Sequence, residues 1–292
     1  MGRPAATIVV PTYNEAHHLD ACVRSVLKQT RTDWELIVVD DASSDGTAEV
    51  VGCFDDPRIR YLRNAANLGP PASRNVGVLA ASTEFIFFLD ADCQAAENWL
   101  EQGLELFEER GLAGIEGRLI YVAPDYRPAY SDRIVQNLTG GFYMTANMAY
   151  RKEALLKVGL FNPELRRYED RDLALRVKNS GAIVFAPQMV VTHAHVKWTP
   201  RAYLRSAQAA CYTVTMYKRN KSDQAAHRIY YGIYRPKELL AIVFPPLVLT
   251  ELFAEQFRTF DDFLVLAMVY PRMVYERVLL WQASIRERTL LI

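Results

Sequence analysis

The sequence predicts an α/β fold in which a mainly parallel central sheet is flanked by helices and followed by a helical C-terminal extension. Through the first hundred residues, short apolar runs alternate with segments whose apolar residues recur at helical spacing. The runs are apolar on both faces, as expected of parallel strands that helices cover on both sides. Beyond Pro200 the chain is aromatic and helical in pattern, without strong strand signals.

The expected elements follow one another along the chain in strand–helix order. Strands are expected at Thr7–Val10, Glu35–Asp40, Ile59–Arg63 and Phe85–Leu89. Helices are expected at Glu15–Thr30, after the turn Ser43–Thr47, at Ala72–Ala81 and at Glu97–Glu109. From about Gly114 the order is mixed, with strand-like runs at Gly117–Val122, Met144–Tyr150 and Val190–Val196 and helices around Lys152–Val158 and Asp170–Asn179.

Composition limits the classes of protein to which the chain can belong. Its 292 residues are 50% hydrophobic, which is enough to bury a sizeable core. Lysine plus arginine and aspartate plus glutamate both number 34, so the net charge disfavours a nucleic-acid partner. The four cysteines lack the spacing of a zinc site or a disulfide scaffold, which favours reduced thiols and a cytoplasmic location. The apolar run Ala5–Pro11 soon meets Asn14 and Glu15, which indicates a first strand and not a secretion signal.

Two carboxylates follow the fourth expected strand. Asp90 and Asp92 come directly after Phe85–Leu89, and side chains two apart in an extended chain point the same way. Paired oxygen ligands of this kind suit a Mg²⁺ or Mn²⁺ ion that carries phosphates. Ligands of parallel sheets bind beyond the carboxyl ends of the strands, so the polar residues there are expected to meet at one edge, here called the rim. The rim comprises Thr12–Glu15, Asp40–Asp41, Asn64–Arg74 and Asp90–Asp92.

A nucleotide bound at this rim has to be held by side chains and a metal, because the sequence contains neither Gly-x-Gly nor a Walker loop. Asp41 can accept a hydrogen bond from a base or a ribose hydroxyl, and Arg74 can stack on a base or pair with phosphate. Gly69, followed by two prolines, predicts a tight turn that allows close backbone approach. Two other roles stay open here: a helix cap for Asp40 or Asp41, and an ordinary surface charge for Arg74.

Seven segments together resemble a known family. In chain order they are Thr7–Glu15, Val38–Thr47, Asn67–Gly77, Leu89–Asp92, Thr145–Ala149, Val158–Phe161 and Tyr168–Arg176. Their order resembles that of the family 2 glycosyltransferases, which are usually inverting enzymes of the GT-A fold that use nucleotide sugars. The resemblance implies a Rossmann-like GT-A catalytic domain at 1–198, with a nucleotide-binding half at about 1–113 and an acceptor half at 114–198. Residues 199–292 would form the helical extension.

The resemblance implies a role for each matching position. Pro11, Thr12, Tyr13, Glu15, Asp41 and Arg74 would hold the nucleotide, with Gly69 and Ala91 also expected at the nucleotide-sugar site. Asp90 would contact ribose or metal, and Asp92 would bind the metal, either Mg²⁺ or Mn²⁺. Asp170, in the catalytic Glu169–Asp170 pair, would be the general base. Ser73 and the segment Phe161–Pro163 depart from the common family pattern, which blurs the identity of the substrate.

The chemistry expected of Asp170 follows from its position at the predicted start of a helix. Unpaired N–H groups and the helix dipole favour a carboxylate there, so we expect Asp170 to be ionised at neutral pH. An ionised carboxylate close to an acceptor hydroxyl can take its proton as that hydroxyl attacks the sugar. The other interpretation is that Glu169, Asp170 and Asp172 cap the helix and pair with neighbouring arginines.

His193 and His195 lie two apart in the strand-like run Val190–Val196 and are expected to face the same way. A histidine after the Glu–Asp helix resembles a position that in some family members helps to hold the metal or the diphosphate. His193 is the candidate for that role, and a structural histidine without it is the alternative.

The last third of the chain carries a separate pattern. Residues 197–237 hold nine basic side chains and one acid, with six tyrosines among them, and the apolar runs Leu239–Leu249 and Phe263–Tyr270 follow. Each run is shorter than the roughly 20 residues that span a bilayer. This pattern predicts peripheral contact with the cytoplasmic face of a membrane and, equally well, a helical cap on the core or a homodimer interface.

We therefore predict an inverting, metal-dependent glycosyltransferase that moves a sugar from a nucleoside-diphosphate sugar to a hydroxyl of a glycan or lipid-linked acceptor in cell-envelope or exopolysaccharide synthesis. One alternative is a sugar nucleotidyltransferase, which would normally show a glycine-rich first loop with a following arginine; Pro11–Glu15 has neither. The other is a non-catalytic, membrane-associated scaffold with a vestigial nucleotide site. The donor base, the sugar, the acceptor and the linkage are not encoded in any motif.

Overall fold

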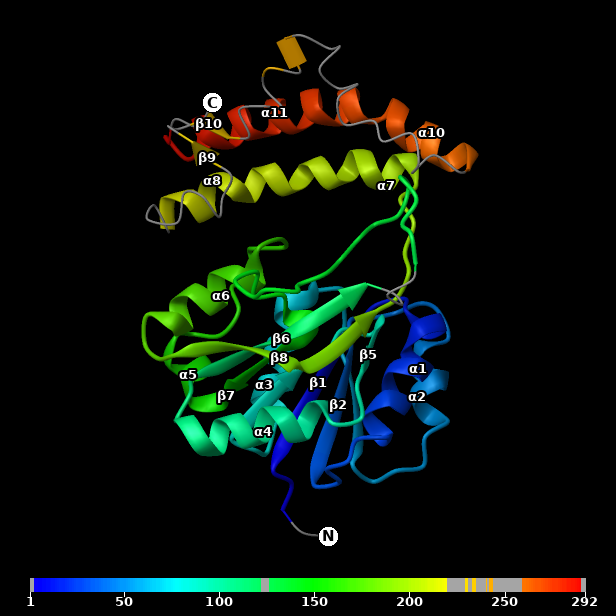
Figure 1. Ribbon diagram of the computed structural model, residues 1–292, viewed down its shortest axis with the longest axis vertical. Helices are drawn as coiled ribbons and strands as arrows, with labels where there is room; N and C mark the ends of the chain where they lie inside the picture. Colours follow the sequence, from blue (N-terminus) through cyan, green and yellow to red (C-terminus); the bar gives the residue numbers. More distant parts are fainter. Residues whose placement is uncertain are drawn as a thin grey trace. The chain divides into compact units, whose positions relative to one another are not determined.

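The computed structural model describes residues 3–121, 126–219, 229–230, 233–234, 240, 242–243 and 259–289. The chain divides into two compact units, and most of their helices and strands are labelled in Figure 1. The first unit comprises residues 1–123 and 135–194, and the second comprises 124–134 and 195–292. The segment 124–134, although it lies inside the expected acceptor half, therefore belongs with the C-terminal helices.

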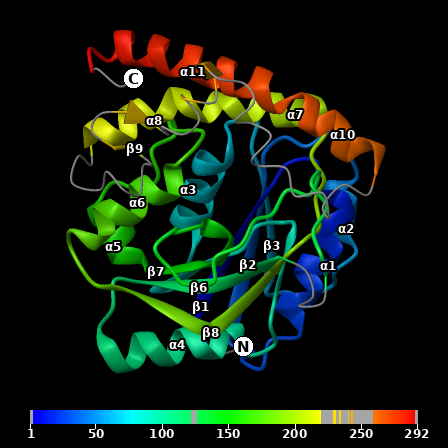
Figure 2. The ribbon, with the colours of Figure 1, turned by 45° about the horizontal axis from the view of Figure 1, so that its top comes forward.

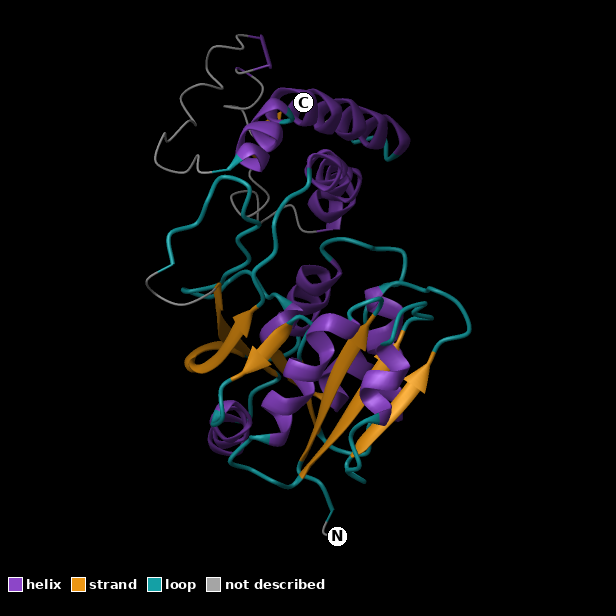
Figure 3. Ribbon diagram, turned by 90° about the vertical axis from the view of Figure 1, so that its right-hand side faces the viewer, coloured by secondary structure: helices purple, strands orange, loops and turns teal. Residues whose placement is uncertain are grey.

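The first unit is built on one mixed sheet of eight strands in the order β3-β2-β1-β4-β7-β6-β8-β5. The strands are β1 (Ala6–Thr12), β2 (Trp34–Asp40), β3 (Ile59–Arg63), β4 (Phe85–Phe88), β5 (Cys93–Ala95), β6 (Gly114–Tyr121), β7 (Met148–Arg151) and β8 (Ile183–His193). β3, β2, β1 and β4 are mutually parallel, as are β6 and β8, whereas β7 and the short β5 are antiparallel to their neighbours. Figure 3 shows these strands as a twisted sheet with helices on both sides.

Helices cover both faces of this sheet, which explains why its strands are continuously apolar. The helices are α1 (Ala16–Leu27), α2 (Thr47–Gly52), α3 (Pro70–Ala80), α4 (Trp99–Arg110), α5 (Lys152–Lys157) and α6 (Glu169–Lys178), with a 3-10 turn η1 at Thr145–Asn147. Successive side chains of a strand point to opposite faces. Ile8 and Val10 of β1 therefore join the core under α1, α2 and α4, whereas Val9 joins the core under α3, α5 and α6. All three side chains are fully buried.

Helix α3 can approach β1 closely because a glycine lies at the contact. A Cβ atom on Gly77 would lie 2.3 Å from Cγ1 of Val9, a distance that no real contact allows. A larger side chain would push α3 away from the sheet. The N-terminal part of α3, which carries Pro70 and Arg74, would move with it.

The second unit is helical, and its described part is organised around α8 and α11. Its elements are α7 (Pro200–Arg205), a 3-10 turn η2 (Ser206–Ala209), α8 (Ala210–Arg219), the strands β9 (Ile229–Tyr230) and β10 (Ile233–Tyr234), α10 (Phe260–Ala267) and α11 (Val269–Arg286). α8 and α11 lie side by side (Figures 1 and 2) and share a small apolar core that includes Val214 and Leu280. The segment 126–134 is bound to α10 through Asp262, whose carboxylate accepts the N–H of Ser131 at 2.7 Å. In the described part of the chain, no helix is long and apolar enough to cross a membrane.

The last expected strand of the first unit ends earlier than the sequence suggests. β8 begins at Ile183 and ends at His193, where the chain leaves the sheet. The expectation that His193 and His195 face the same way is therefore wrong, because only the first of them lies in the strand. His195 belongs to the second unit, where its Nε2 lies 2.8 Å from Oδ1 of Asp132.

Two short elements are absent from the sequence-based prediction, namely β5 and the β9–β10 hairpin. Each has only two or three residues per strand, too few for a periodic pattern to be visible. The basic, tyrosine-rich residues after 219 and the run Leu239–Leu249 lie largely outside the described residues.

Candidate functional site

A cavity of about 250 Å³ lies at the carboxyl ends of β1, β2 and β4. It is lined by Pro11, Thr12, Tyr13, Glu15, Asp41, Asn67, Pro70, Ser73, Arg74, Asp90, Ala91 and Asp92. The rim residues therefore converge, as expected for the carboxyl edge of a parallel sheet. Among the residues predicted to hold the nucleotide sugar, Gly69 is not part of this lining, although its backbone helps to build the wall.

The loops that follow β1 and β2 are joined to each other beside this cavity. The N–H of Asn14 donates to Oγ of Ser43 at 2.9 Å, and the N–H of Ser44 donates to Oδ1 of Asn14 at 2.8 Å. Asn14 and Ala42 both adopt the left-handed backbone conformation, with φ of 55° and 63°. Such conformations cost roughly 1–3 kcal/mol each outside glycine and cluster at functional sites. The two loops are therefore held in shape by bonds across the rim.

Asp41 anchors the loop between β3 and α3. Its Oδ1 accepts the side-chain amide of Asn64 at 2.7 Å and the N–H of Leu68 at 2.9 Å, and its Oδ2 accepts the N–H of Gly69 at 2.8 Å. Burial acts to raise the pKa of Asp41, but the hydrogen bonds outweigh burial and hold the pKa below its usual value. Gly69 has φ +89°, which a residue with a side chain would adopt only with strain. The hydroxyl of Ser73 adds a further hydrogen bond to this carboxylate, so most of its acceptor positions are occupied.

The neighbouring carboxylate, Asp40, is committed to the fold. It is fully buried, and it accepts hydrogen bonds from the N–H of Ser43, the hydroxyl of Tyr61 and the guanidinium of Arg63. The helix-cap role left open for this pair falls to neither aspartate, because α2 begins at Thr47 and Asp40 holds the preceding turn through the N–H of Ser43. Asp41 is the residue that lines the cavity.

Arg74 connects the cavity to the beginning of α6. Its Nη2 donates to Oδ1 of Asp90 at 2.8 Å, and its Nη1 donates to Oε1 of Glu169 at 3.0 Å. The side chain is buried, so the surface-charge interpretation is excluded. Burial opposes the charged form, but the two carboxylates outweigh it and raise the pKa of Arg74 above its ordinary value. Its planar fork thus holds two acids from distant parts of the sequence in fixed positions.

The short strand β5 brings a histidine to the second aspartate of the Asp-x-Asp motif. Cys93 of β5 is paired with His193 of β8, so Asp92 lies beside the end of β8. Oδ2 of Asp92 is 3.3 Å from Nε2 of His193. The Nδ1 atom of His193 lies 2.8 Å from the carbonyl of Ala194, which identifies Nδ1 as the protonated nitrogen. The Nε2 lone pair then faces Asp92, the arrangement found in metal-binding histidines.

These residues fit a divalent cation. Two acceptor atoms that face each other, here on Asp92 and His193, need a proton or a cation between them. Burial and the negative charge of Asp90 raise the pKa of Asp92, and Glu15 adds to this effect while His193 opposes it. Asp92, Cys93 and His193 offer ligand atoms that all lie within 4.8 Å of one another. Carboxylate oxygens suit Mn²⁺ or Mg²⁺, whereas the imidazole and the thiol suit softer ions, so Asp92 is the ligand of this group that fits the predicted ion best.

Glu169 and Asp170 form the first turn of α6. The preceding residue, Tyr168, has φ 63°, an uncommon conformation for an aromatic residue. Asp170 is half-buried, and its Oδ1 accepts the N–H of Arg171 at 2.7 Å. Because Arg74 contacts both Asp90 and Glu169, a single side chain links the cavity wall to the residue beside Asp170.

The expectation that Asp170 is fully ionised at neutral pH needs correction. Burial and the negative charge of Glu169 raise the pKa of Asp170 to about 7, while the N–H of Arg171 and the charge of Arg74 act in the opposite direction. The helix N-terminus contributes only about 1 kcal/mol, less than one pKa unit, and is outweighed. A carboxylate with a pKa near 7 is well suited to general acid–base catalysis at neutral pH.

Two further comparisons with the sequence-based interpretation concern Asp172 and Ser73. Asp172 is buried, and its Oδ2 lies 2.7 Å from Nη2 of Arg176, so the helix-pairing interpretation holds for this residue.

Ser73 is more than a departure from a family pattern, since it lines the cavity and its Oγ accepts the amide of Asn64 at 3.0 Å. Asn67 and Pro70 line the cavity as well, and their only signal in the sequence is that they fall inside the Asn67–Gly77 segment.

Comparisons with known proteins place the chain in a family. Residues 7–159 match the family model described as Glycosyl transferase family 2. The chain is 26% identical over 203 residues to Glycosyltransferase AglE of Haloferax volcanii, a match that covers 65% of this chain and 67% of AglE. It is 40% identical over 111 residues to the Escherichia coli protein UDP-Glc:alpha-D-GlcNAc-diphosphoundecaprenol beta-1,3-glucosyltransferase WfgD, covering 38% of this chain and 44% of WfgD. The match thus spans less than half of the second relative.

A solved structure supports the fold. The chain resembles mannosyltransferase PcManGT from Pyrobaculum calidifontis, in complex with GDP-Man and Mn²⁺, with a TM-score of 0.64 and 18% identity. This likeness covers 99% of this chain and 88% of the other. The predicted α/β fold of GT-A type, with a helical C-terminal region, is confirmed.

Proposed function

Because the chain belongs to glycosyl transferase family 2, we propose that it transfers a sugar from a nucleoside-diphosphate sugar to an acceptor hydroxyl in a single inverting displacement. The observation that carries this proposal is the double contact of Arg74 with Asp90 in the cavity wall and with Glu169 beside Asp170. A nucleotide sugar in the cavity and an acceptor hydroxyl at Asp170 can therefore approach each other.

The nucleotide is held by the walls of the cavity. Asp41 lines the cavity and, besides fixing the β3–α3 loop, is the carboxylate there that can accept a base N–H or a ribose hydroxyl. Tyr13 is 48% exposed and lines the same cavity, so its ring is available for stacking. The fork of Arg74 is used to hold Asp90 and Glu169, which makes Arg74 a positioning residue.

Asp170 acts as the general base. The acceptor oxygen attacks the anomeric carbon, its proton passes to the Asp170 carboxylate, and the bond from that carbon to the diphosphate oxygen breaks to release the nucleoside diphosphate. Attack from the side opposite the leaving group inverts the anomeric centre, and no side chain has to act as a nucleophile. Glu169 and Arg74 tune and position Asp170.

Asp92 and His193, with Asp90 nearby, are the residues that would hold Mg²⁺ or Mn²⁺. When bound, the ion supplies positive charge that neutralises the departing diphosphate. The Pyrobaculum mannosyltransferase, whose structure contains GDP-Man and Mn²⁺, supports this part of the proposal.

The acceptor is proposed to be a glycan intermediate of envelope polysaccharide synthesis, carried on a lipid. WfgD, by its name, glucosylates a GlcNAc-diphosphoundecaprenol. A lipid-linked acceptor of that kind has to be reached at a membrane surface.

We further propose that α10 and α11 make this peripheral contact. Their large apolar side chains are unusually exposed, with exposed fractions of 76% for Phe260, 57% for Phe263, 46% for Trp281 and 79% for Ile285. In soluble proteins such groups are normally few and scattered, so four of them on two consecutive helices favour an interaction surface. The nine basic residues against one acid in 197–237 favour an anionic lipid surface as the partner.

Vesicle co-sedimentation tests the membrane contact. The double variant Trp281→Gln/Ile285→Gln is expected to bind vesicles of anionic lipid at least about tenfold more weakly. It lacks two apolar side chains that would be buried in the lipid when the protein binds. Leu79→Gln on α3, which is 61% exposed, is the matched control and should bind like the wild type. Unchanged vesicle binding by the double variant, together with a fall in oligomeric mass measured by light scattering, would identify a homodimer interface instead.

The activity itself is tested by transfer and hydrolysis assays with UDP-, GDP- and dTDP-sugars, each with and without Mn²⁺. We expect one donor to be consumed, with the rate dependent on the ion and inverted stereochemistry in the product. Calorimetry with UDP, GDP and dTDP in Mn²⁺ accompanies the assay. Heat from none of the three nucleotides would favour the non-catalytic scaffold.

A further inference from the structure

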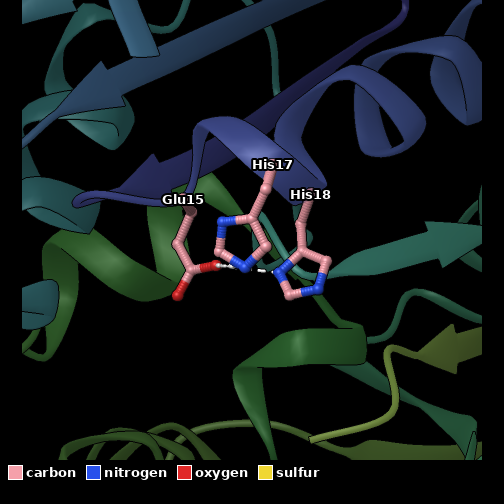
Figure 4. A group of neighbouring side chains, drawn as sticks. All are labelled: Glu15, His17 and His18. Atoms are coloured by element: carbon pink, nitrogen blue, oxygen red, sulfur yellow. Dashed lines mark hydrogen bonds and ion pairs between the residues drawn. The ribbon is translucent and has the colours of Figure 1, made fainter. Parts of the chain in front are cut away.

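A second cluster of metal-binding side chains lies at the beginning of α1. Figure 4 shows Glu15, His17 and His18 pointing to the same side of this helix. Nδ1 of His18 is 2.9 Å and Nε2 of His17 is 3.8 Å from the same oxygen, Oε2 of Glu15. The three ligand atoms all lie within 4.8 Å of one another. The imidazole rings are also adjacent, with centroids 3.9 Å apart.

This spacing matches the requirement of one small ion. Nitrogen and oxygen ligands lie about 2.0–2.2 Å from Zn²⁺, so two of them in a tetrahedral arrangement are about 3.4 Å apart. The two contacts of Glu15 bracket that value. Adjustment is easy because the His17 side chain is 67% exposed and those of Glu15 and His18 are also partly exposed.

The chemistry of the ligands differs from that of the Asp92–His193 pair. Two imidazoles and one carboxylate favour Zn²⁺, Ni²⁺ or Co²⁺ over Mg²⁺, whereas the aspartates around Asp92 favour Mg²⁺ or Mn²⁺. We propose that Glu15, His17 and His18 form a separate binding site for a transition metal of the Zn²⁺ class. An ion at this site engages Glu15, which also lines the donor cavity.

The consequence is a link between this site and donor binding, which rests on the proposed function. One carboxylate oxygen of Glu15 cannot bind the ion and a nucleotide sugar at the same time. Zn²⁺ at the cluster is therefore expected to raise the KM for the donor more than it lowers kcat. The binding of the ion itself does not depend on what the protein catalyses.

Direct metal binding is the first arm of the test. The variant His17→Gln/His18→Asn keeps an amide nitrogen close to each interacting imidazole nitrogen, and with it the hydrogen-bonding capacity toward Glu15, but it lacks the imidazole ligands. Co²⁺ absorption spectra and Zn²⁺ calorimetry of the full chain should show one site fewer in the variant, or a site weakened by more than about tenfold. His193→Gln is the reciprocal control and should retain the outer site. Identical Co²⁺ spectra and Zn²⁺ stoichiometry in the variant and the wild type would overturn the proposal.

Inhibition is the second arm. With Mn²⁺ in excess, the wild type should lose donor affinity at Zn²⁺ concentrations that leave the His17→Gln/His18→Asn variant unaffected, and the variant should keep its rate without Zn²⁺. Equal inhibition of both proteins by Zn²⁺ would refute the link to donor binding. Whether the ion binds to Glu15, His17 and His18 would still be decided by the metal-binding measurements. Absence of transfer activity in both proteins would contradict the proposed function and would leave the outcome of the metal-binding arm intact.

Discussion

Asp41 and Asp170 are two aspartates at the same site, yet their surroundings have opposite effects on them. Asp41 is almost fully buried, but it accepts hydrogen bonds from Asn64, Leu68 and Gly69, and its pKa is held low. Asp170 is half-buried, and burial together with the negative charge of Glu169 raises its pKa to about 7, because few donors oppose them. Burial alone therefore does not decide the pKa, because the number of donors and the sign of nearby charges decide which carboxylate stays ionised.

In the proposed function, this difference separates an aspartate that shapes the cavity from one that acts as the general base. The acceptor positions of Asp41 are largely used by the β3–α3 loop, so its pKa is low and it stays ionised near neutral pH. Asp170 is poised to bind and release a proton near neutral pH, as a general base requires. The following predictions test each side of the comparison.

The largest effect is expected for Asp170→Asn. An amide cannot take the acceptor proton, so kcat should fall by about 10³-fold, within the range that general bases contribute, while nucleotide affinity stays unchanged. Transfer assays and calorimetry measure the two quantities. Asp20→Asn on the exposed face of α1 is the matched control. Normal transfer by Asp170→Asn would remove this residue from the mechanism.

Asp41→Asn should act on stability and on donor binding together. The NH₂ group of the new amide would face N–H groups that now donate to the carboxylate, so at least one hydrogen bond is lost. We therefore expect the free energy of unfolding to fall by about 1–3 kcal/mol. The donor KM should rise because the wall of the cavity loosens. Denaturant unfolding and donor titrations provide the readout, and unchanged stability would show that the three hydrogen bonds are not the anchor described.

Glu169→Gln should move the pH profile. Because the pKa of Asp170 is raised to about 7, we expect the acid limb of kcat/KM in the wild type near pH 7. Removing the neighbouring negative charge lowers the pKa of Asp170, so the limb should shift to lower pH. Initial rates between pH 5 and 9 measure this shift. A limb that stays in place would mean that another group titrates.

The smallest effect is a pH-dependent gain in stability for Asp170→Asn. The pKa of Asp170 is higher in the folded chain than the value of about 3.9 in an unfolded one, so the wild type loses stability as the pH rises from about 4 to 7. The variant has no such charge to bury. Its Tm relative to the wild type should therefore be higher at pH 8 than at pH 4.5. A difference in Tm that does not change with pH would contradict the raised pKa.

Much of the fold could be predicted because the strands under helices on both faces carry continuous apolar runs. Strands such as Glu35–Asp40 and Phe85–Leu89 were expected within one residue of their observed ends. β5 could not be predicted, because its three residues exist as a strand only through pairing with β8. The assignment of 124–134 to the second unit likewise depends on distant contacts, such as the bond between Ser131 and Asp262.

The residues of the candidate site could be predicted from the sequence, but the contacts between them could not. The motifs indicate that Asp41, Arg74 and Asp170 are present, and the topology of a parallel sheet brings the first two to one edge. That Arg74 bridges Asp90 and Glu169 depends on how α3 and α6 are packed, which local pattern does not encode. The raised pKa of Asp170 depends mainly on burial, which exists only in the folded chain, whereas the charge of the adjacent Glu169 is visible in the sequence.

The most direct test is a crystal structure of the chain with Mn²⁺, an unreactive analogue of its donor and an acceptor. The account predicts that Asp92 and His193 bind the ion on the diphosphate, and that a carboxylate oxygen of Asp170 lies about 3 Å from the acceptor hydroxyl. A complex in which Asp170 points away from the acceptor, or in which the diphosphate lies outside the cavity lined by Asp41 and Asp92, would contradict it.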